Sequence, residues 1–175
     1  MKLYYKIIFF FFILIFPLKN KLLASDIYFI DYSKVMNESV AGKKAQNYLQ
    51  NLLKNSNKQF NETAKKLKSE ENKIISQKNV LSKEEYKKKA DSLRKKVFDL
   101  NKEREKSIRE VATKRKKAGD EMLKNLNPIL GKYMKENSIA VVIDKKNVLM
   151  GDKKFEITAQ IIEILNKEFK SINLN

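Results

Sequence analysis

Residues that favour turns are scarce in this chain. Its 175 residues include only four glycines and two prolines, and one of the prolines, Pro17, lies near the N-terminus. Because glycine and proline are the commonest interruptions of regular structure, long continuous elements are expected. From Ala41 onward, apolar residues recur at three- and four-residue steps, the spacing of one helical face, over roughly 40 residues or about 60 Å. The chain is therefore predicted to be built around long amphipathic helices.

The first helical pattern breaks at QKNVLS, residues 77–82. Ser82 and Glu85 then have the spacing of a capping box, in which the hydroxyl and the carboxylate each satisfy a free amide at the start of a new helix. The chain is therefore expected to turn back here. Two helices joined in this way predict an antiparallel hairpin arm over residues 41–136, with its tip at about 77–82.

The second helix is expected to extend for roughly 45 to 50 residues. Its apolar stripe consists of Tyr86, Ala90, Leu93, Val97, Leu100, Ile108, Val111, Ala118, Met122, Leu126 and Ile129, with Arg104 and Arg115 at the positions between. Pro128 lacks the amide that a helical turn needs. It is expected to kink or restart the helix near Asn127.

Strand signals lie on either side of the arm. IYFID, residues 27–31, is short and apolar, while IAVVID, residues 139–144, and NVLM, residues 147–150, predict a β-hairpin. Thr158 is expected to cap a final amphipathic helix. The fold class is thus predicted to be α+β and mainly helical, with a small β-strand head formed by residues 25–40 and 137–175 and split by the arm.

A head of about 50 ordered residues rarely buries enough apolar surface to be stable alone. Disulfides cannot help, because the chain has no cysteine. Short strands would also leave exposed edges that invite pairing with other copies. The head is therefore predicted to oligomerise through its strands, with the contacts made by Ile27, Phe29, Val141, Ile143 and Val148.

The first 24 residues have the features of a secretory signal peptide. Lys2 and Lys6 precede an apolar run from Ile7 to Phe16, and the small residues Ala24 and Ser25 follow. A membrane-spanning helix needs roughly 20 apolar residues, so this run is too short to span a bilayer comfortably. Cleavage is predicted near Ala24.

Catalysis is not expected. The chain has neither cysteine nor histidine, so the common nucleophile, general-base and metal-binding side chains are missing. No catalytic residue, metal site or cofactor is predicted, and the protein is not expected to be an enzyme. Asp31 and Asp144, each at a strand end, are interpreted as turn or capping residues rather than as a catalytic pair.

Positive charge is concentrated in the arm. The net charge of +17 falls to +13 without the four lysines up to Lys21, and residues 54–124 carry 23 basic and 12 acidic side chains, a net charge of +11. The basic arm surface is expected to comprise Lys87, Lys88, Lys89, Arg94, Lys95, Lys96, Lys114, Arg115, Lys116 and Lys117. These residues form either a solvated helical face or a surface that attracts acidic partners or phosphate-bearing lipid.

Several motifs, in their order along the chain, carry a family resemblance. IYFIDYSKVMNESVAGKKAQ leads from a strand into the first helix, LSKEEY marks the arm tip, IAVVIDKKNVLM follows the arm, and EITAQIIEILN forms the final helix. Together they resemble the Skp/OmpH family of periplasmic chaperones, over essentially the whole chain after the signal. In this sequence, Asn137 and Ser138 replace a common Gly–aromatic pair.

The resemblance implies a homotrimer in the periplasm of a Gram-negative bacterium. Its strands would form a central β-body, and its three arms would enclose a basic cavity for unfolded outer-membrane β-barrel proteins. Such a protein is a holdase, which prevents aggregation of its clients, the unfolded proteins that it binds, without ATP. Contact with anionic membrane lipid is a further possible partner interaction.

Candidate client-binding residues are apolar side chains of the arm: Phe60, Leu67, Ile74, Tyr86, Leu93 and Phe98. Most of them are expected to lie in the seam between the two helices. Phe98 is the strongest candidate, because it stands beside the stripe position Val97 rather than on it.

Two functions of other classes compete with this hypothesis. A nucleic-acid-binding protein would use the basic helices to neutralise phosphate, but the signal segment argues against it and no specific nucleic acid is expected. A structural coiled-coil protein of the envelope would favour an uncleaved anchor and a continuous seam, and neither is evident.

Overall fold

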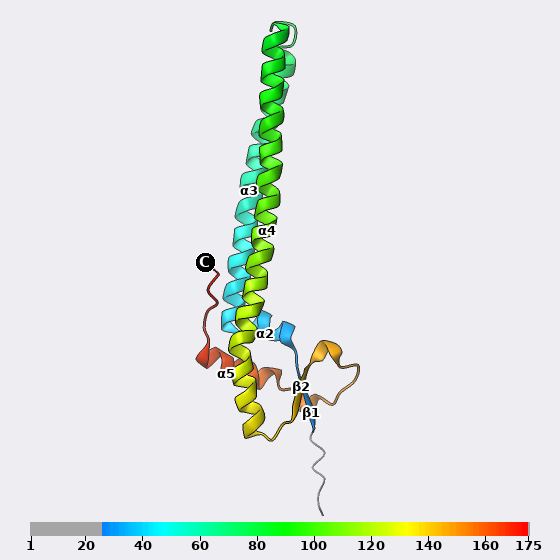
Figure 1. Ribbon diagram of the computed structural model, residues 1–175, viewed down its shortest axis with the longest axis vertical. Helices are drawn as coiled ribbons and strands as arrows, with labels where there is room; N and C mark the ends of the chain where they lie inside the picture. The colour runs from blue at the N-terminus through cyan, green and yellow to red at the C-terminus, as the bar shows by residue number, and fades with distance from the viewer. Residues whose placement is uncertain (1–25, 175) are drawn as a thin grey trace, which may run out of the picture.

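The computed structural model describes residues 26–174 and consists of a long helical hairpin standing on a small head (Figure 1). The elements are β1 (Ile27–Ile30), α2 (Tyr32–Glu38), α3 (Val40–Ser76), α4 (Lys83–Glu136), β2 (Val141–Asp144), the 3-10 turns η1 (Lys145–Asn147) and η2 (Lys153–Phe155), and α5 (Thr158–Glu168). This mainly helical α+β fold confirms the predicted class.

The predicted signal peptide lies outside the described residues. Within residues 26–174, none of the helices combines the length and the apolar character needed to cross a bilayer.

The arm has the predicted form. α3 and α4 are antiparallel and lie side by side from the head to the tip (Figure 1). The tip contains the predicted capping box: the Ser82 hydroxyl accepts a hydrogen bond from the Glu85 amide at 3.2 Å, and the Glu85 carboxylate accepts one from the Ser82 amide at 3.1 Å.

The strand that follows the arm pairs with β1, as predicted, but the expected hairpin is wrong. β2 is parallel to β1, with Ile27 opposite Val141 and Phe29 opposite Ile143. Beyond β2, the Asp144 carboxylate accepts a hydrogen bond from the Lys146 amide at 3.2 Å and closes a 3-10 turn over Lys145–Asn147. Residues 148–150, where most of the second hairpin strand was expected, form no strand. Val148 is therefore in a loop and not in a strand.

The other edge of β1 is also occupied. Glu156 forms a single parallel bridge with Phe29, and the Ile157 amide donates a hydrogen bond to the Phe29 carbonyl oxygen at 3.0 Å. β1 is thus the middle element of the sheet. Among the described residues, the outer edge of β2 has no strand beside it.

Two N-terminal helix caps set the path of the chain from β1 into the arm. The Asp31 side chain caps the short helix α2 through the Lys34 amide at 2.8 Å, and the buried Ser39 hydroxyl caps α3 through the Gly42 amide at 3.1 Å. α2 packs so closely on α3 that a Cβ atom at Gly42 would lie 2.1 Å from the Met36 carbonyl oxygen. Glycine is therefore required at this position, and the sequence pattern did not reveal α2 as a separate helix.

α4 passes through Pro128 and remains one helix of 54 residues. The predicted restart near Asn127 is wrong. An internal proline disfavours a helix by about 3 kcal/mol, but the neighbouring Leu126 and Ile129 are buried in the core, so tertiary packing holds the helix together. α4 ends in a Schellman motif, in which Ser138 has a φ of 54° and the Ile139 amide donates to the Met134 carbonyl oxygen at 2.9 Å.

The head and the last turns of α4 share one core. Its buried members come from β1, α2, α3, α4 and α5: Ile30, Val35, Ala41, Met122, Leu126, Ile129, Ile157, Ile161 and Leu165. The Tyr32 hydroxyl ties α2 to α4 by donating to the Gly119 carbonyl oxygen at 3.0 Å, and burial raises the pKa of this phenol above its usual 10.0. The division between head and arm at residue 136 stays a prediction, since α4 contributes to both.

Thr158 connects the two halves of the head. It was expected to cap α5, but it is the first residue of that helix, and its buried hydroxyl accepts a hydrogen bond from the Asp31 amide at 2.9 Å. The same hydroxyl donates to the Glu156 carboxylate at 3.1 Å, and Lys145 donates to that carboxylate at 2.9 Å. A polar chain therefore joins the end of β1 to α5 and to the turn after β2.

This chain of hydrogen bonds makes the stability of the head depend on pH. The hydrogen bond from Lys145 holds the pKa of Glu156 below its ordinary value of 4.5. A pKa that is lower in the folded state means that the stabilisation is complete above about pH 4.5 and is lost as the pH falls through the folded-state value.

We therefore expect Glu156→Gln to lower the free energy of unfolding by about 1 to 3 kcal/mol at pH 7 and by much less at about pH 2.5, where the Glu156 carboxylate of the wild-type chain becomes protonated. Urea unfolding at both pH values measures this difference. Glu168→Gln, at an exposed position in the last turn of α5, is the matched control and should have little effect at either pH. An equal loss for Glu156→Gln at both pH values would contradict the assignment.

Candidate functional site

The distal arm has a thin seam. In α3 no residue between Leu49 and Ile74 is buried, and in α4 none is buried before Val111. The seam there consists of half-buried side chains, and its polar links include a salt bridge from Lys96 to Glu70 at 2.7 Å. Sparse apolar contact gives low local stability. The arm far from the head is therefore the least stably packed part of the hairpin.

Five of the six candidate client-binding residues lie in this seam. Ile74 is buried, and Phe60, Leu67, Tyr86 and Leu93 are half-buried. The Arg104 guanidinium lies 5.8 Å from the centre of the Phe60 ring and holds it by a cation–π contact. Leu67 and Leu93 line a surface cleft of about 520 Å³ between α3 and α4. Ile74 is therefore available to a ligand only where the seam opens, whereas the half-buried residues are partly accessible from the surface.

Phe98 differs from the other candidates because its side chain is 66% exposed. It projects from the outside of α4, next to Val97 on the cleft between the helices. A phenylalanine whose side chain is already in solvent presents apolar surface without any rearrangement of the seam.

Ile108 is a second exposed apolar residue, which the sequence pattern placed wrongly. The pattern predicted Ile108 in the seam, whereas the structure turns Ser107 inward and leaves Ile108 64% exposed. The inward positions after Leu100 are Arg104, Ser107 and Val111, a regular helical spacing that a search for apolar residues alone skips. Ile75 and Val80 are exposed in the same way near the tip.

The predicted basic surface divides into paired and unpaired residues. Arg94 bonds to Asp91 at 2.7 Å, Lys116 to Asp120 at 2.7 Å, and Lys89 to the Gln77 side chain at 3.1 Å. Lys114 is folded against the base of the arm and is only 19% exposed. Of the ten predicted basic residues, all of which the structure describes, Lys87, Lys88, Lys95 and Arg115 are exposed and have neither an ion pair nor a hydrogen bond.

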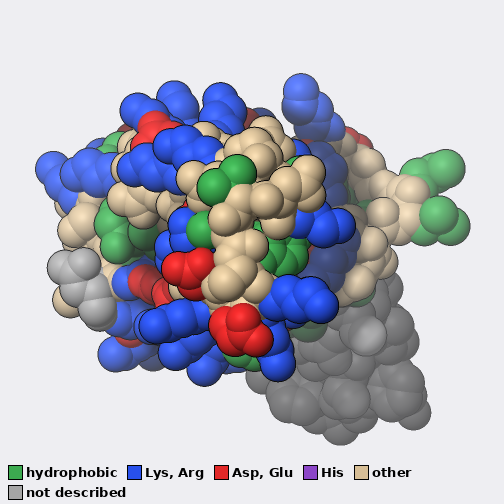
Figure 2. Space-filling model, turned by 90° about the horizontal axis from the view of Figure 1, so that it is seen from above, with side chains coloured by type: hydrophobic (Ala, Val, Ile, Leu, Met, Phe, Trp, Pro, Cys, Tyr) green, Lys and Arg blue, Asp and Glu red, His purple; other side chains and the backbone are tan. Residues whose placement is uncertain are grey.

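Seen from above, with the arm tip toward the viewer, Lys and Arg side chains lie around most of the outline of the molecule (Figure 2). Hydrophobic and acidic side chains lie between them. The surface is therefore basic in most directions rather than on one face, and apolar spots are interspersed with the charge.

Within residues 26–174, no three acidic side chains come close enough together to hold a metal ion. Asp31 and Asp144 are confirmed as capping residues, because they accept from the Lys34 and Lys146 amides respectively. Their roles are accounted for by local structure.

Comparison with known proteins identifies the family. Residues 26–165 match the sequence profile of the outer membrane protein (OmpH-like) family. The match spans most of the chain, so the protein belongs to that family, as its motifs indicated. No curated protein matches the sequence.

A solved structure has the same fold. The crystal structure of an OmpH-like protein from Caulobacter crescentus CB15, described as a candidate outer membrane chaperone, superposes with a TM-score of 0.77 at 16% sequence identity. The superposition covers 84% of this chain and 87% of that one. The strand, hairpin arm and closing helix are therefore a shared architecture.

Proposed function

We propose that the protein is an ATP-independent periplasmic holdase that binds unfolded outer-membrane β-barrel proteins between helical arms and prevents their aggregation before membrane insertion. The observation that carries the proposal is the combination of solvent-exposed apolar side chains, Phe98 and Ile108, with unpaired basic side chains on one long hairpin. Membership of the OmpH-like family supports it. The crystal structure described as that of a candidate outer membrane chaperone supports it as well.

The charges of the arm suit such a client. Unfolded outer-membrane proteins tend to be acidic and expose apolar strand segments, so a basic arm attracts them over a distance while isolated apolar residues bind them loosely. Many weak contacts permit release without an energy source. The unpaired Lys87, Lys88, Lys95 and Arg115 would attract the phosphates of anionic lipid in the same way when the arm approaches a membrane.

A single copy cannot enclose a client, so the proposal includes assembly. The outer edge of β2 is open among the described residues, and exposed apolar side chains lie on or near it. Ile27 and Val141 are paired across the sheet, and Leu149 and Met150 are fully exposed in the following loop. An open edge beside apolar side chains favours pairing between copies, and the family resemblance indicates three of them.

The assembly can be tested by multi-angle light scattering of residues 25–175 at micromolar concentration. We expect the mass of a trimer. Val141→Lys, which places a charge on the proposed contact strand, should shift the mass toward that of the monomer, because burying an unpaired charge is strongly unfavourable. Lys132→Glu in α4, which also changes charge but on an exposed side chain, is the control and should leave the trimer intact. A monomeric wild-type chain would contradict the proposal.

The holdase activity can be tested by light scattering of a denatured outer-membrane barrel protein diluted into buffer with stoichiometric trimer and no nucleotide. We expect the wild-type chain to suppress aggregation. Phe98→Ala and Ile108→Ala should each weaken client affinity by roughly fivefold, which corresponds to about 1 kcal/mol of lost apolar contact, without lowering the free energy of unfolding.

Leu123→Ala is the matched control, because Leu123 is an exposed apolar residue of α4 that lies beside the head. It should leave client affinity unchanged. Failure of the wild-type chain to suppress aggregation would overturn the proposed function. Unchanged affinity for both arm variants would overturn only their assignment as contact residues.

A further inference from the structure

The C-terminal segment leaves the head and lies on the base of the arm. α5 ends at Glu168, and residues 169–174 continue without helix or strand along α3 (Figure 1). Leu174 is only 6% exposed and packs against Ala45 and Leu49 of α3 and Ala118 of α4. A segment without helix or strand is held in place only by such contacts, so the partners of Leu174 determine where the segment lies.

The segment is also held by its backbone. The Lys114 ammonium donates a hydrogen bond to the Leu174 carbonyl oxygen at 2.7 Å. The same ammonium lies 5.7 Å from the centre of the Tyr48 ring and 3.9 Å from the Glu110 carboxylate. Lys114 is therefore a positioned donor for a peptide carbonyl group and not a freely solvated charge.

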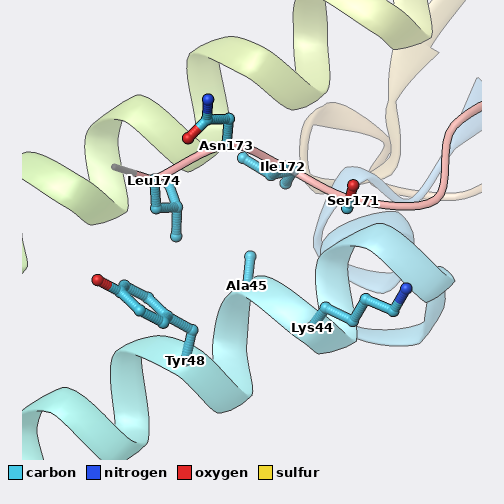
Figure 3. A pocket seen from close by; sticks show the side chains of 7 residues that line it. All are labelled: Lys44, Ala45, Tyr48, Ser171, Ile172, Asn173 and Leu174. Carbon is cyan, nitrogen blue, oxygen red and sulfur yellow. The ribbon is translucent and has the colours of Figure 1, made fainter.

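The contacts alternate along the segment. Leu174 points toward α3 (Figure 3) and Ile172 packs against the same apolar cluster, while Ser171 and Asn173 are exposed. Between the segment and α3 a cavity of about 460 Å³ remains, lined on the α3 side by Lys44, Ala45 and Tyr48. The small side chain of Ala45 leaves room there for a larger apolar group than the segment provides.

These features define what the surface recognises. It binds an apolar side chain at every second residue of an extended chain, and Lys114 donates a hydrogen bond to one of the peptide carbonyl groups of that chain. Alternation with a period of two is the pattern of a β-strand with one apolar face, and a carbonyl group is common to every sequence. The base of the arm is thus complementary to an extended amphipathic segment of almost any sequence.

The segment is held weakly enough to be replaced. One buried leucine side chain and one hydrogen bond from Lys114 are its main contacts with the arm, and contacts of this number hold a segment only weakly. A tethered ligand acts at an effective concentration of order millimolar, so it blocks weak ligands and yields to a stronger or longer one.

We infer that the base of the arm is a second polypeptide-binding site, which the chain's own C-terminal segment occupies until an extended amphipathic segment of an unfolded protein displaces it. This inference rests on the proposed holdase function and adds a self-blocked site to it. The exposed arm residues make first contact, and the displaced C-terminal segment opens a further contact close to the head.

The first test uses a fluorescein-labelled peptide with the sequence of residues 168–175, added to residues 25–175 and followed by fluorescence anisotropy. Leu174→Asp places a charge in the apolar cluster and releases the attached segment. The free peptide should therefore bind this variant at least roughly tenfold more tightly than it binds the wild-type chain. Ser171→Asp adds the same charge at an exposed position of the segment and should behave like the wild-type chain.

Equal binding of the peptide to all three proteins, or binding to none of them, would overturn the inference.

A second test keeps the segment in place. The chain has no cysteine, so the double substitution Ala45→Cys and Leu174→Cys, at two positions of one apolar cluster, introduces the only two cysteines of the chain, which oxidation can join. The oxidised form should bind neither the peptide nor the additional client segment, and reduction should restore both.

Aggregation assays with the oxidised and reduced double variant separate the two proposals. Weaker suppression by the oxidised form, recovered on reduction, would support the second site. Equal suppression by both forms would overturn this inference and leave the holdase function standing. Absence of suppression in both forms and in the wild-type chain would overturn the holdase function itself.

Discussion

The parallel pairing of β1 with β2 is the interaction on which the rest of the structure depends. It joins two short strands that the whole arm separates in the sequence. The entropy lost on closing a flexible loop grows with its length, but α3 and α4 form an antiparallel hairpin that returns the chain to its starting point. The arm therefore makes the closure favourable, and the head in turn aligns the two ends of the arm.

Closure of the head relies on packing as well as pairing. Met122 and Leu126 of α4 lie in the same core as Val35 of α2 and Ile161 of α5. The buried hydroxyl of Thr158 adds a polar link between the ends of the chain. Stability is consequently concentrated where the arm meets the head and declines along α3 and α4, where few side chains are buried. This decline in stability along the arm suits the proposed holdase, which would hold unfolded clients with a weakly packed arm.

Much of this architecture follows from local signals. The three- and four-residue spacing of apolar side chains, the scarcity of glycine and proline, and the Ser82–Glu85 capping box together predict the hairpin and its tip. The apolar strands on both sides predict the split head. Each signal is local and needs no knowledge of distant contacts, which is why it can be read from the sequence.

The features that escaped prediction depend on contacts between distant residues. NVLM has the composition of a strand, and the outer edge of β2 has no strand beside it among the described residues, but the Asp144 cap closes a 3-10 turn over Lys145–Asn147 that turns the chain away from this edge. Pro128 is tolerated because the core holds α4 on either side of it. Ile108 was assigned to the seam because the stripe was traced through apolar residues only, whereas Ser107 occupies the inward position. The docking of Leu174 on the arm has no local signal at all.

The central claim is that a firmly closed head carries an arm whose stability falls toward its tip. Hydrogen–deuterium exchange of the free protein measures this directly, residue by residue. The account predicts that amides of β1, of α5 and of α4 near Met122 exchange most slowly, and that amides of α3 around Phe60 and of α4 around Phe98 exchange much faster although they are helical. Uniform protection along α3 and α4, equal to that of the head, would contradict it.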